Sequence, residues 1–536
     1  MIPLVGNPRR AWLLGAAVAV LALGESGAAF AMFTNSTTAG PGSFQTGTLP
    51  TPGGLALGNG GCSGGAGQTN VVSTWTGSSA LDASGNYLVA GYDVLRSASS
   101  SGPYSSAGSV SGNPPATQYT DTSPSGATAP LVYVSAGNGA ASAQSINSST
   151  YAAATVTLSG AVGDEPNALQ VTPDGTKLVV AEGAAHQVQI VSTATGAVTS
   201  TVSIPAVGGT QSKPNAVAVS PSGTTAWIVD AANARVYPLS LATSTLGPAI
   251  SVGTQGDPTA MVVTPNGAQV LVADYGSHQV SAINTSTDAV TNIAIGGATG
   301  TPIALAATPN SAHVYVADQA SSQIDDIATS TDTVTTTLAL ASSSLADGNF
   351  SGGGDPNILA ITPNGSKLYV ASYQGGTVED ITVGSDTLAG TIQLPPGGVD
   401  GAPDPNALAL TPNGCTLYVN DYDNNKVDVY AVSTDTLEGT PPPIGSTGDP
   451  IGMAAAPNGA AVLVANYYDS TVSVISTSSN TVVDTPGTGS GGPSPYAIAI
   501  APSAYYYEVV GTHGGWASVP SSPAMYVLGW NVGGWQ

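Results

Sequence analysis

The stretch "DPNALALTPNGCTLYVNDY", from Asp404 to Tyr422, contains two short apolar runs separated by a proline turn. "ALAL" is apolar at every position and too short for a helix, so it predicts a β-strand buried on both faces. In "TPNG", Pro412 presets φ at the first turn position and Gly414 supplies a left-handed residue, which together favour a hairpin. "CTLYV" then predicts the returning strand.

Nearly the same stretch recurs along the chain. "DEPNALQVTPDGTKLVVAEG" begins at Asp164, "DPTAMVVTPNGAQVLVADY" at Asp257 and "DPIGMAAAPNGAAVLVANY" at Asp449. A third apolar run and a weaker fourth run follow each copy, so each unit predicts a meander of four strands. The prolines that open the first strands lie 44 to 54 residues apart: Pro166, Pro214, Pro258, Pro302, Pro356, Pro405, Pro450 and Pro495.

This period predicts the architecture. Repeats of four short strands every ~40 to 50 residues are typical of a β-propeller, an all-β fold whose blades pack around a channel. Seven complete units lie between Pro166 and Gly492. A divergent copy of the beginning of the repeat, "SPYAIAIAPSAYYYEVV", begins at Ser494. We expect eight blades rather than seven. The eighth would take its inner strands from this last segment and its outer strand from Ala153 to Gly160.

The repeat also resembles a known family. "PNALALTPNG" followed by "LYVNDYDNNKVDVYAVSTDTLEGT" is similar to the YVTN-type β-propeller repeat of bacterial and archaeal surface proteins. The resemblance extends from about Asp164 to Val510, and members of the family are mostly seven-bladed. It implies the fold rather than a function, because propellers host many unrelated activities.

The region before the propeller has a different pattern. "NVVSTWTGSS", "YLVAGYDVLRS" and "TQYTDTSP" are short alternating strands without the repeat, and with Trp75 in an early strand they resemble a fibronectin type III sandwich. The last strand, in "PLVYVSAGNGAASAQSI", fits either this sandwich or the first blade. We expect Trp75 to be a core residue. The expected domains are a signal peptide at 1–31, a linker or N-terminal extension at 32–67, the sandwich at 68–149, the propeller at 150–512 and a tail at 513–536.

The N-terminus predicts export. "NPRR" is a short basic region, "AWLLGAAVAVLALG" is an apolar core, and Ala29-Phe30-Ala31 is a small-x-small cleavage pattern. The apolar core is shorter than an ordinary membrane span, although an uncleaved anchor is the alternative. We expect an extracellular or cell-surface protein with no membrane span once the leader is removed.

Charge and cysteine content exclude some classes of protein. The 536 residues include 8 Lys and Arg against 32 Asp and Glu, a net charge of −24, yet only 7% of residues are charged. So few Lys and Arg residues cannot neutralise the phosphates of a nucleic acid, which excludes a nucleic-acid partner. Cys62 and Cys415 lie in different predicted regions, so no disulfide is expected.

The sequence offers no catalytic, cofactor or metal site. His186 and His278 occupy the same turn position, before "QV" in both repeats, and are expected to be turn residues. No Cys–His cluster has the spacing of a zinc site. "DYDNN" at 421–425 opens like a calcium loop, but Lys426 replaces the required glycine and Val432 the required glutamate, so the motif is incomplete.

One polar position recurs between the second and third strands of the repeats. Asp and Asn at such a place commonly hydrogen-bond their own turn backbone, which is the structural interpretation. The functional interpretation is an acidic ring on one face, dotted with Tyr275, Tyr373, Tyr422 and Tyr467, that attracts cations or a glycan. The ring positions are Glu182, Asp230, Asp274, Asp318, Ser372, Asp421 and Asn466.

Two hypotheses of function follow. The first is an exported, non-enzymatic binding or display protein in which the propeller binds a surface protein or a glycan and the sandwich is a spacer. The second is a propeller enzyme of the lactonase or streptogramin-lyase type. A catalytic site should break the repeat in one or two blades, whereas the polar positions found here recur in almost every blade.

Overall fold

The computed structural model describes the chain from 166 to 487 with short gaps at 254–256, 298–299, 341–358, 373–374, 397–402, 423, 440–442 and 445–449. On either side it describes the strands named below and a few residues next to them, and the expected signal peptide lies outside the described residues. The described fold is all-β, with two short 3₁₀ turns, η1 (Ala231–Asn233) and η2 (Tyr275–Ser277). No helix among the described residues is long and apolar enough to cross a membrane.

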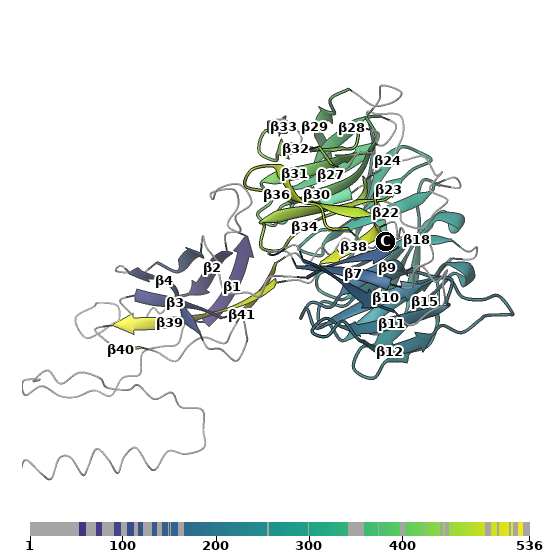
Figure 1. Cartoon of the computed structure of the whole chain (residues 1–536), viewed down its shortest axis with the longest axis horizontal. Helices are drawn as coiled ribbons and strands as arrows, with labels where there is room; N and C mark the ends of the chain where they lie inside the picture. The colour runs from purple at the N-terminus through teal and green to yellow at the C-terminus, as the bar shows by residue number, and fades with distance from the viewer. Residues whose placement is uncertain are drawn as a thin grey trace, which may run out of the picture.

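Eight sheets form the blades of a propeller (Figure 1). We number them 1 to 8 and call their strands A to D from the channel outward. Blades 1 to 3 consist of β9 (Pro166–Val171), β10 (Lys177–Glu182), β11 (Gln187–Ser192) and β12 (Val198–Ser203); β13 (Pro214–Val219), β14 (Thr225–Asp230), β15 (Arg235–Ser240), β16 (Thr245–Leu246) and β17 (Ile250–Ser251); and β18 (Pro258–Val263), β19 (Gln269–Asp274), β20 (Gln279–Asn284) and β21 (Val290–Ala294).

Blades 4 to 7 repeat the arrangement. They consist of β22 (Pro302–Ala307), β23 (His313–Asp318), β24 (Gln323–Ala328) and β25 (Thr333–Ala339); β26 (Leu359–Ile361), β27 (Lys367–Ser372), β28 (Thr377–Thr382) and β29 (Thr387–Gln393); β30 (Pro405–Leu410), β31 (Thr416–Asp421), β32 (Lys426–Ala431) and β33 (Thr436–Leu437); and β34 (Pro450–Ala455), β35 (Ala461–Asn466), β36 (Thr471–Ser476) and β37 (Thr481–Asp484).

Blade 8 closes the ring with strands from both ends of the chain. Its innermost strand is β38 (Pro495–Ile500), followed outward by β6 (Leu131–Ala136), β7 (Ser142–Asn147) and β8 (Ala153–Thr157). β38 contacts both β34 of blade 7 and β9 of blade 1. The eight-bladed expectation is confirmed, including the innermost and outermost strands of this blade. The second strand is β6 rather than the expected "SAYYYEVV", because that segment pairs elsewhere.

The remaining strands form two further sheets beside the propeller (Figure 1). β1 (Gly53–Asn59), β2 (Val71–Thr76) and β5 (Gln118–Asp121) form one; β4 (Ser105–Ser111), β3 (Gly91–Ser97), β39 (Ser503–His513), β40 (Trp516–Ala517) and β41 (Ala524–Leu528) form the other. Trp75 is buried and meets Tyr92 edge-on, with ring centroids 5.3 Å apart, which packs one sheet against the other.

These pairings differ from the expected domain boundaries of 68–149, 150–512 and 513–536. β6 and β7 belong to the propeller, whereas β39 to β41 complete the two-sheet domain, and β1 lies in the segment expected to be a linker. The physical reason is that the whole of β3 pairs with β39, from Gly91 opposite Thr512 to Ser97 opposite Tyr506. The propeller is therefore inserted in the chain of the two-sheet domain.

The recurring "TPNG" turn joins strands A and B and also joins blades. In blade 6 the Thr411 hydroxyl donates to Asn413 Oδ1 (2.6 Å) and accepts the Thr416 N–H (3.1 Å). Gly414 has φ 70°, as the sequence predicts, and a Cβ there would lie 3.0 Å from Pro363 of the same turn in blade 5. The glycine thus serves both the left-handed turn and the close contact between blades.

The "PN" dipeptide connects neighbouring blades around the channel. Asn215 Nδ2 of blade 2 donates to the carbonyl of Pro258 in blade 3 (3.1 Å), and Asn406 Nδ2 of blade 6 donates to that of Pro450 in blade 7 (3.1 Å). Thr259 makes the same bond to Pro302. Apolar side chains fill the remaining space between adjacent blades. The repeated sequence is therefore the contact that each blade makes with the next.

Candidate functional site

The seven predicted ring residues lie together at one end of the blades, but inside them. All seven side chains are fully buried. Each is the last residue of its B strand, and six lie opposite the proline that opens the A strand, as Asp318 lies opposite Pro302. We call this end of the propeller the B–C face, because the turns between strands B and C lie on it. The opposite end, with the A–B turns, is the hairpin face.

Three of the buried carboxylates bind backbone N–H groups. Asp230 accepts a bond from Lys213 N (2.8 Å), and Asp318 accepts one from Thr301 N (2.7 Å). Asp274 accepts one from Ser277 N (3.2 Å), and burial nevertheless raises the pKa of Asp274. These contacts are those of a residue that fixes the chain at the entry to strand A or in the B–C turn.

The other ring positions bond to side chains on strand C. Glu182 Oε2 accepts bonds from Gln187 and Gln189, at 2.6 and 2.5 Å. Asn466 Nδ2 donates to the hydroxyls of Thr471 (3.0 Å) and Ser473 (2.8 Å). Ser372 donates to a buried carboxylate, described below. In blades 1 to 7 the ring residue thus ties strand B to a neighbouring strand or turn.

In blade 6 the first acid of the incomplete calcium motif, Asp421, is paired with a lysine. Lys426 Nζ lies 3.3 Å from carboxylate oxygens of both Asp421 and Asp428, and both acids are fully buried. Asn424 Nδ2 also donates to Asp421 (2.7 Å). Burial raises the pKa of Asp428 to about 6 despite the ammonium group. Asp423, the middle residue of the incomplete motif, lies outside the described residues.

Sequence reasoning missed a second set of buried acids, which breaks the repeat in three consecutive blades. Asp325, Glu379 and Asp428 occupy one register position on strand C of blades 4, 5 and 6. Ser372 donates to Glu379 Oε2 (2.8 Å). The signal was visible in "QIDDIA", "TVEDIT" and "KVDVYA", where acids replace the apolar or neutral polar residues of other blades. An acid within such a strand indicates a buried polar contact.

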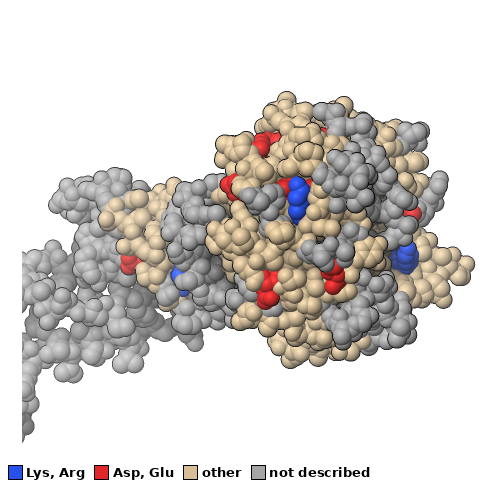
Figure 2. Space-filling model, turned by 45° about the horizontal axis from the view of Figure 1, so that its top comes forward, with Lys and Arg blue, Asp and Glu red and all other residues tan. Residues whose placement is uncertain are grey.

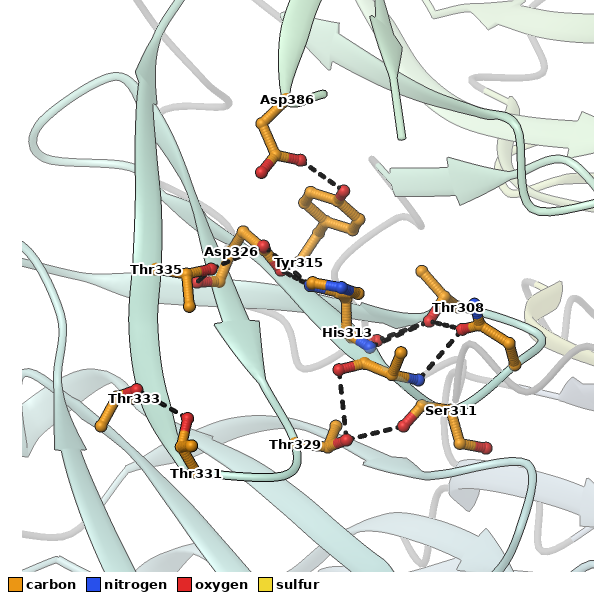
Figure 3. A network of polar contacts seen from close by, with 12 residues as sticks. Thr308, Ser311, His313, Tyr315, Asp326, Thr329, Thr331, Thr333, Thr335 and Asp386 are labelled. Atoms are coloured by element: carbon orange, nitrogen blue, oxygen red, sulfur yellow. Dashed lines mark hydrogen bonds and ion pairs between the residues drawn. The ribbon is translucent and has the colours of Figure 1, made fainter. Parts of the chain in front are cut away.

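His313 belongs to a polar network between blades 4 and 5 (Figure 3). Its Nδ1 lies 2.8 Å from Asp326 Oδ2, which also accepts the Thr335 hydroxyl at 2.8 Å. On the same face of blade 4, the Tyr315 hydroxyl donates to Asp386 of blade 5 (2.7 Å). Burial raises the pKa of Asp326. The buried carboxylate therefore fixes the orientation of the His313 ring.

Blade 5 has the same arrangement with lysine in place of histidine. Lys367 Nζ lies 2.8 Å from Asp380 Oδ2 and 3.2 Å from Asp435 Oδ2 of blade 6. Burial alone would lower the pKa of Lys367, but its bonds to these two carboxylates raise it. The amine is therefore held in its charged form, which suits an ion pair between blades rather than a nucleophile.

The two remaining described histidines of the repeats are turn residues. His186 and His278 both have φ 56°, in the left-handed region. Nδ1 of each contacts a backbone carbonyl, Ser212 O at 2.5 Å and Gly300 O at 2.6 Å respectively. Among the described residues, no group of three or more His, Cys, Asp and Glu side chains is placed to hold a metal ion.

Cys415 is disulfide-bonded, contrary to the sequence expectation. The chain has one other cysteine, Cys62, which lies outside the described residues. The expectation rested on the assignment of the two cysteines to different regions. Such an assignment does not limit distance when a domain is inserted in another, because segments far apart in sequence then lie side by side.

The surface has few charges and carries tyrosines on the B–C face. In Figure 2 the red and blue groups of the described residues stand apart from one another among uncharged residues drawn in tan. Tyr275, Tyr422 and Tyr467 follow the ring residues of blades 3, 6 and 7 directly and are partly exposed. Tyr468 is 65% exposed, and its ring meets that of Tyr467 edge-on at 5.0 Å. Tyr373 lies outside the described residues.

Comparison with known proteins supports the propeller. The family model described as "Lactonase, 7-bladed beta-propeller" matches residues 282–392 and 379–495, which is less than half of the chain. No curated protein matches the sequence. The match runs from blade 3 to blade 8, and the eight blades of this chain differ from the seven in the family's description.

Solved structures with similar folds include proteins of different kinds. Hydrazine synthase of Kuenenia stuttgartiensis is 19% identical, covering 58% of this chain and 95% of that one, with a TM-score of 0.45. A streptogramin B lyase is 13% identical, covering 56% and 89%, with a TM-score of 0.44. Dihydro-heme d1 dehydrogenase NirN is 14% identical, covering 68% and 76%, with a TM-score of 0.47. These similarities concern the fold alone.

Proposed function

We propose that this is an exported binding protein whose propeller presents its B–C face to a partner on or near the cell surface. The two-sheet domain acts as the spacer that holds the propeller. The observation that carries the proposal is the place where the two domains join. Val132, at the start of β6, lies opposite Ile500, at the end of β38. Both connections to the spacer therefore leave blade 8 at its hairpin end, so the B–C face is turned away from them.

The polar groups of the ring support binding rather than catalysis. The ring carboxylates are buried, and their bonds connect strands and turns within their own blades. Among the described residues, the accessible groups of the B–C turns are tyrosines, polar residues and small residues such as Ala320. A face of this kind offers contact area and neutral hydrogen bonds, which are the components of a recognition surface.

The spacer fits a fibronectin type III sandwich with the propeller inserted between its fifth and sixth strands. In that fold the first, second and fifth strands form one sheet, and the third and fourth strands share the other with the last two. Here β1, β2 and β5 form one sheet, and β3 and β4 share the other with β39 and β41. Two connections restrict the motion of the propeller more than one linker would.

The proposal of export rests on the leader-like N-terminus and on the small number of charged residues. We infer a signal peptide at 1–31 and a mature chain that begins near Met32 in the cell envelope or the medium. N-terminal sequencing of protein recovered from those fractions would test this, and a full-length chain found in the cytoplasm would contradict it.

The proposed binding face is tested by blocking each face in turn. Ala320 lies in the B–C turn of blade 4 and Ala460 in the A–B turn of blade 7, and both are exposed. A single Ala320→Cys or Ala460→Cys change allows a maleimide polymer to be attached to one face. We expect polymer at Ala320→Cys to abolish adsorption to isolated envelopes of the producing cells, and polymer at Ala460→Cys to leave it unchanged. Equal effects, or no adsorption by the unlabelled protein, would contradict the proposal.

A lactonase-type enzyme is the second candidate. The family match covers blades 4 to 7, where the strand C acids and the pair of His313 and Asp326 break the repeat. Hydrolysis of a panel of lactones, measured with and without added divalent cations, would test it. Turnover that is lost in both His313→Gln and Asp326→Asn would favour the enzyme.

A further inference from the structure

Tyr467 and Tyr468 form a projecting aromatic pair in the B–C turn of blade 7. Tyr468 is the most exposed large hydrophobic side chain among the described residues, at 65%, and the others, Leu388, Leu437 and Val483, lie on outer D strands. The turn is fixed from below, because buried Asn466 donates to both Thr471 and Ser473 on strand C. An aromatic pair on an anchored turn is a preorganised contact surface.

The neighbouring blade extends this surface. Tyr422 of blade 6 occupies the turn position of Tyr467, directly after the last residue of strand B. The A strands of the two blades, β30 and β34, are in contact, so both turns lie on the same side of the ring. Asn424 and Asp469 stand beside these tyrosines in the two turns. The pattern is aromatic area with amide and carboxylate groups at its edge.

Charge decides which class of ligand suits this surface. The chain carries −24 with 8 basic residues, and Lys426, the one described cation in these two turns and their flanking strand ends, is 19% exposed and paired with Asp421 and Asp428. A polyanion would meet repulsion and no free cation. A flat ligand with an apolar C–H face and a rim of hydroxyls can pack on tyrosine rings and hydrogen-bond to neutral and acidic groups. An uncharged pyranose polymer has this chemistry.

We propose that the B–C turns of blades 6 and 7 form a binding site for an uncharged polysaccharide, with Tyr468 as its central stacking residue. This inference rests on the proposed binding face and specifies its ligand. Tyr467 supports Tyr468 through their edge-on contact, and Tyr422 provides a second aromatic surface for a neighbouring sugar unit. Asp469 and Asn424 lie in the same turns and are partly exposed, so they are the polar groups nearest in sequence to the aromatic surface.

The test is a depletion isotherm of the full mature chain on insoluble chitin and on cellulose. We expect adsorption to at least one of them, weakened roughly tenfold or more in Tyr468→Ala, as for the loss of a central aromatic contact. Tyr468→Trp should retain binding. Leu437→Ala is the matched control, because Leu437 is 41% exposed on an outer strand away from this face, and it should bind as the wild type does.

Binding to cell envelopes separates this inference from the proposed function. Adsorption to envelopes that survives protease treatment but is lost after periodate oxidation of sugars supports the polysaccharide. Adsorption to envelopes without adsorption to either polysaccharide, or wild-type binding by Tyr468→Ala, overturns the inference and leaves the binding face standing. Failure to adsorb to envelopes overturns both.

Discussion

The hydroxyl of Tyr369 in blade 5 donates a 2.7 Å hydrogen bond to Asp435 Oδ1 in the C–D turn of blade 6. Asp435 has φ 54°, in the left-handed region. Tyr418 of blade 6 makes the equivalent bond to Asn480 of blade 7, at 2.7 Å, and φ of Asn480 is 51°. Strand B of one blade therefore holds the outer turn of the next.

We expect removal of these hydroxyls to loosen the contact between blades. Tyr418→Phe deletes a neutral bond and should cost about 1 kcal/mol, whereas Tyr369→Phe deletes a bond to a carboxylate and should cost about 2 kcal/mol. Urea denaturation followed by fluorescence would measure the shift in midpoint. Tyr468→Phe is the control, since that side chain is exposed. An equal urea midpoint for all three variants would show that these hydrogen bonds between blades do not stabilise the protein.

Truncation from the C-terminus should separate the two domains. A chain ending at Pro502 keeps β38, so the ring stays closed, but it loses the partner of β3. We expect this variant to retain a protease-resistant propeller while its first 121 residues are digested.

A chain ending at Ser494 also loses β38, the innermost strand of blade 8. We expect both domains to be destabilised, with a melting temperature many degrees lower. Limited proteolysis and thermal melts of the two truncated chains would measure this. Equal melting of the two would show that β38 does not close the ring.

Most of the propeller could be predicted from sequence, because its structure depends on contacts that repeat. Gly414 and Asn406 reveal the turn and the blade contact, since equivalent residues recur at the same place in other units. The pairing of β3 with β39 could not be predicted in this way. Gly91 and Thr512 are paired although more than four hundred residues separate them, and alternation in "SAYYYEVV" fits any partner strand.

The sequence predicted the positions of the ring residues, but it did not predict that their side chains are buried. A polar residue at the end of strand B fits a turn on the surface and a buried tie to strand C equally well. The choice depends on the neighbouring blade, as where Oδ2 of Asp318 lies 2.1 Å from the place a Cβ of Gly296 would take. A sequence pattern does not report such a distance.

The disulfide at Cys415 leads to a prediction about its partner. We expect its partner to be Cys62, the one other cysteine in the sequence. Peptide mapping without reductant should yield a cross-linked pair containing both residues. Dithiothreitol or Cys415→Ser should then lower the melting temperature, because the cross-link restricts the unfolded chain. A free thiol count of two in the native protein would contradict this prediction.

Replacing a ring aspartate with asparagine should destabilise the protein less than replacing it with alanine. Asp230 accepts Lys213 N through Oδ1 and Asn233 Nδ2 through Oδ2. Asp230→Asn keeps an oxygen for the backbone N–H, and blade 7 already carries Asn466 at this position. Its new NH2 group replaces the acceptor of Asn233 Nδ2, but Asn233 is partly exposed and its amide can turn so that the oxygen accepts instead. We expect Asp230→Asn to shift the urea midpoint little and Asp230→Ala to cost about 1 to 3 kcal/mol, because a buried donor loses its partner. Similar losses in both variants would mean that the negative charge itself is required.

Asp428 makes the stability of the protein depend on pH. Burial raises its pKa in the folded chain to about 6, above the ordinary value of an aspartate. The folded state therefore holds a proton that the unfolded state has released between about pH 4 and pH 6. Stability contributed by this group is present at low pH and is lost as the pH rises through 6. Burial also raises the pKa values of Asp274, Asp325, Asp326 and Asp380, so their effects have the same sign.

Asp428→Asn should remove most of the loss of stability that ionisation of the buried Asp428 carboxyl causes at neutral pH. We expect the variant to be more stable than the wild type at pH 7.5, by on the order of 2 kcal/mol, and nearly equal to it at pH 4.5. Lys426 keeps a carboxylate partner in the variant, because Asp421 Oδ2 remains 3.3 Å from its Nζ. Thermal melts of both proteins across this range, with the exposed Asp288→Asn as the control, would measure the difference. A wild type that grows steadily more stable between pH 4.5 and pH 7.5 would show that the buried acids are ionised and compensated in the folded state.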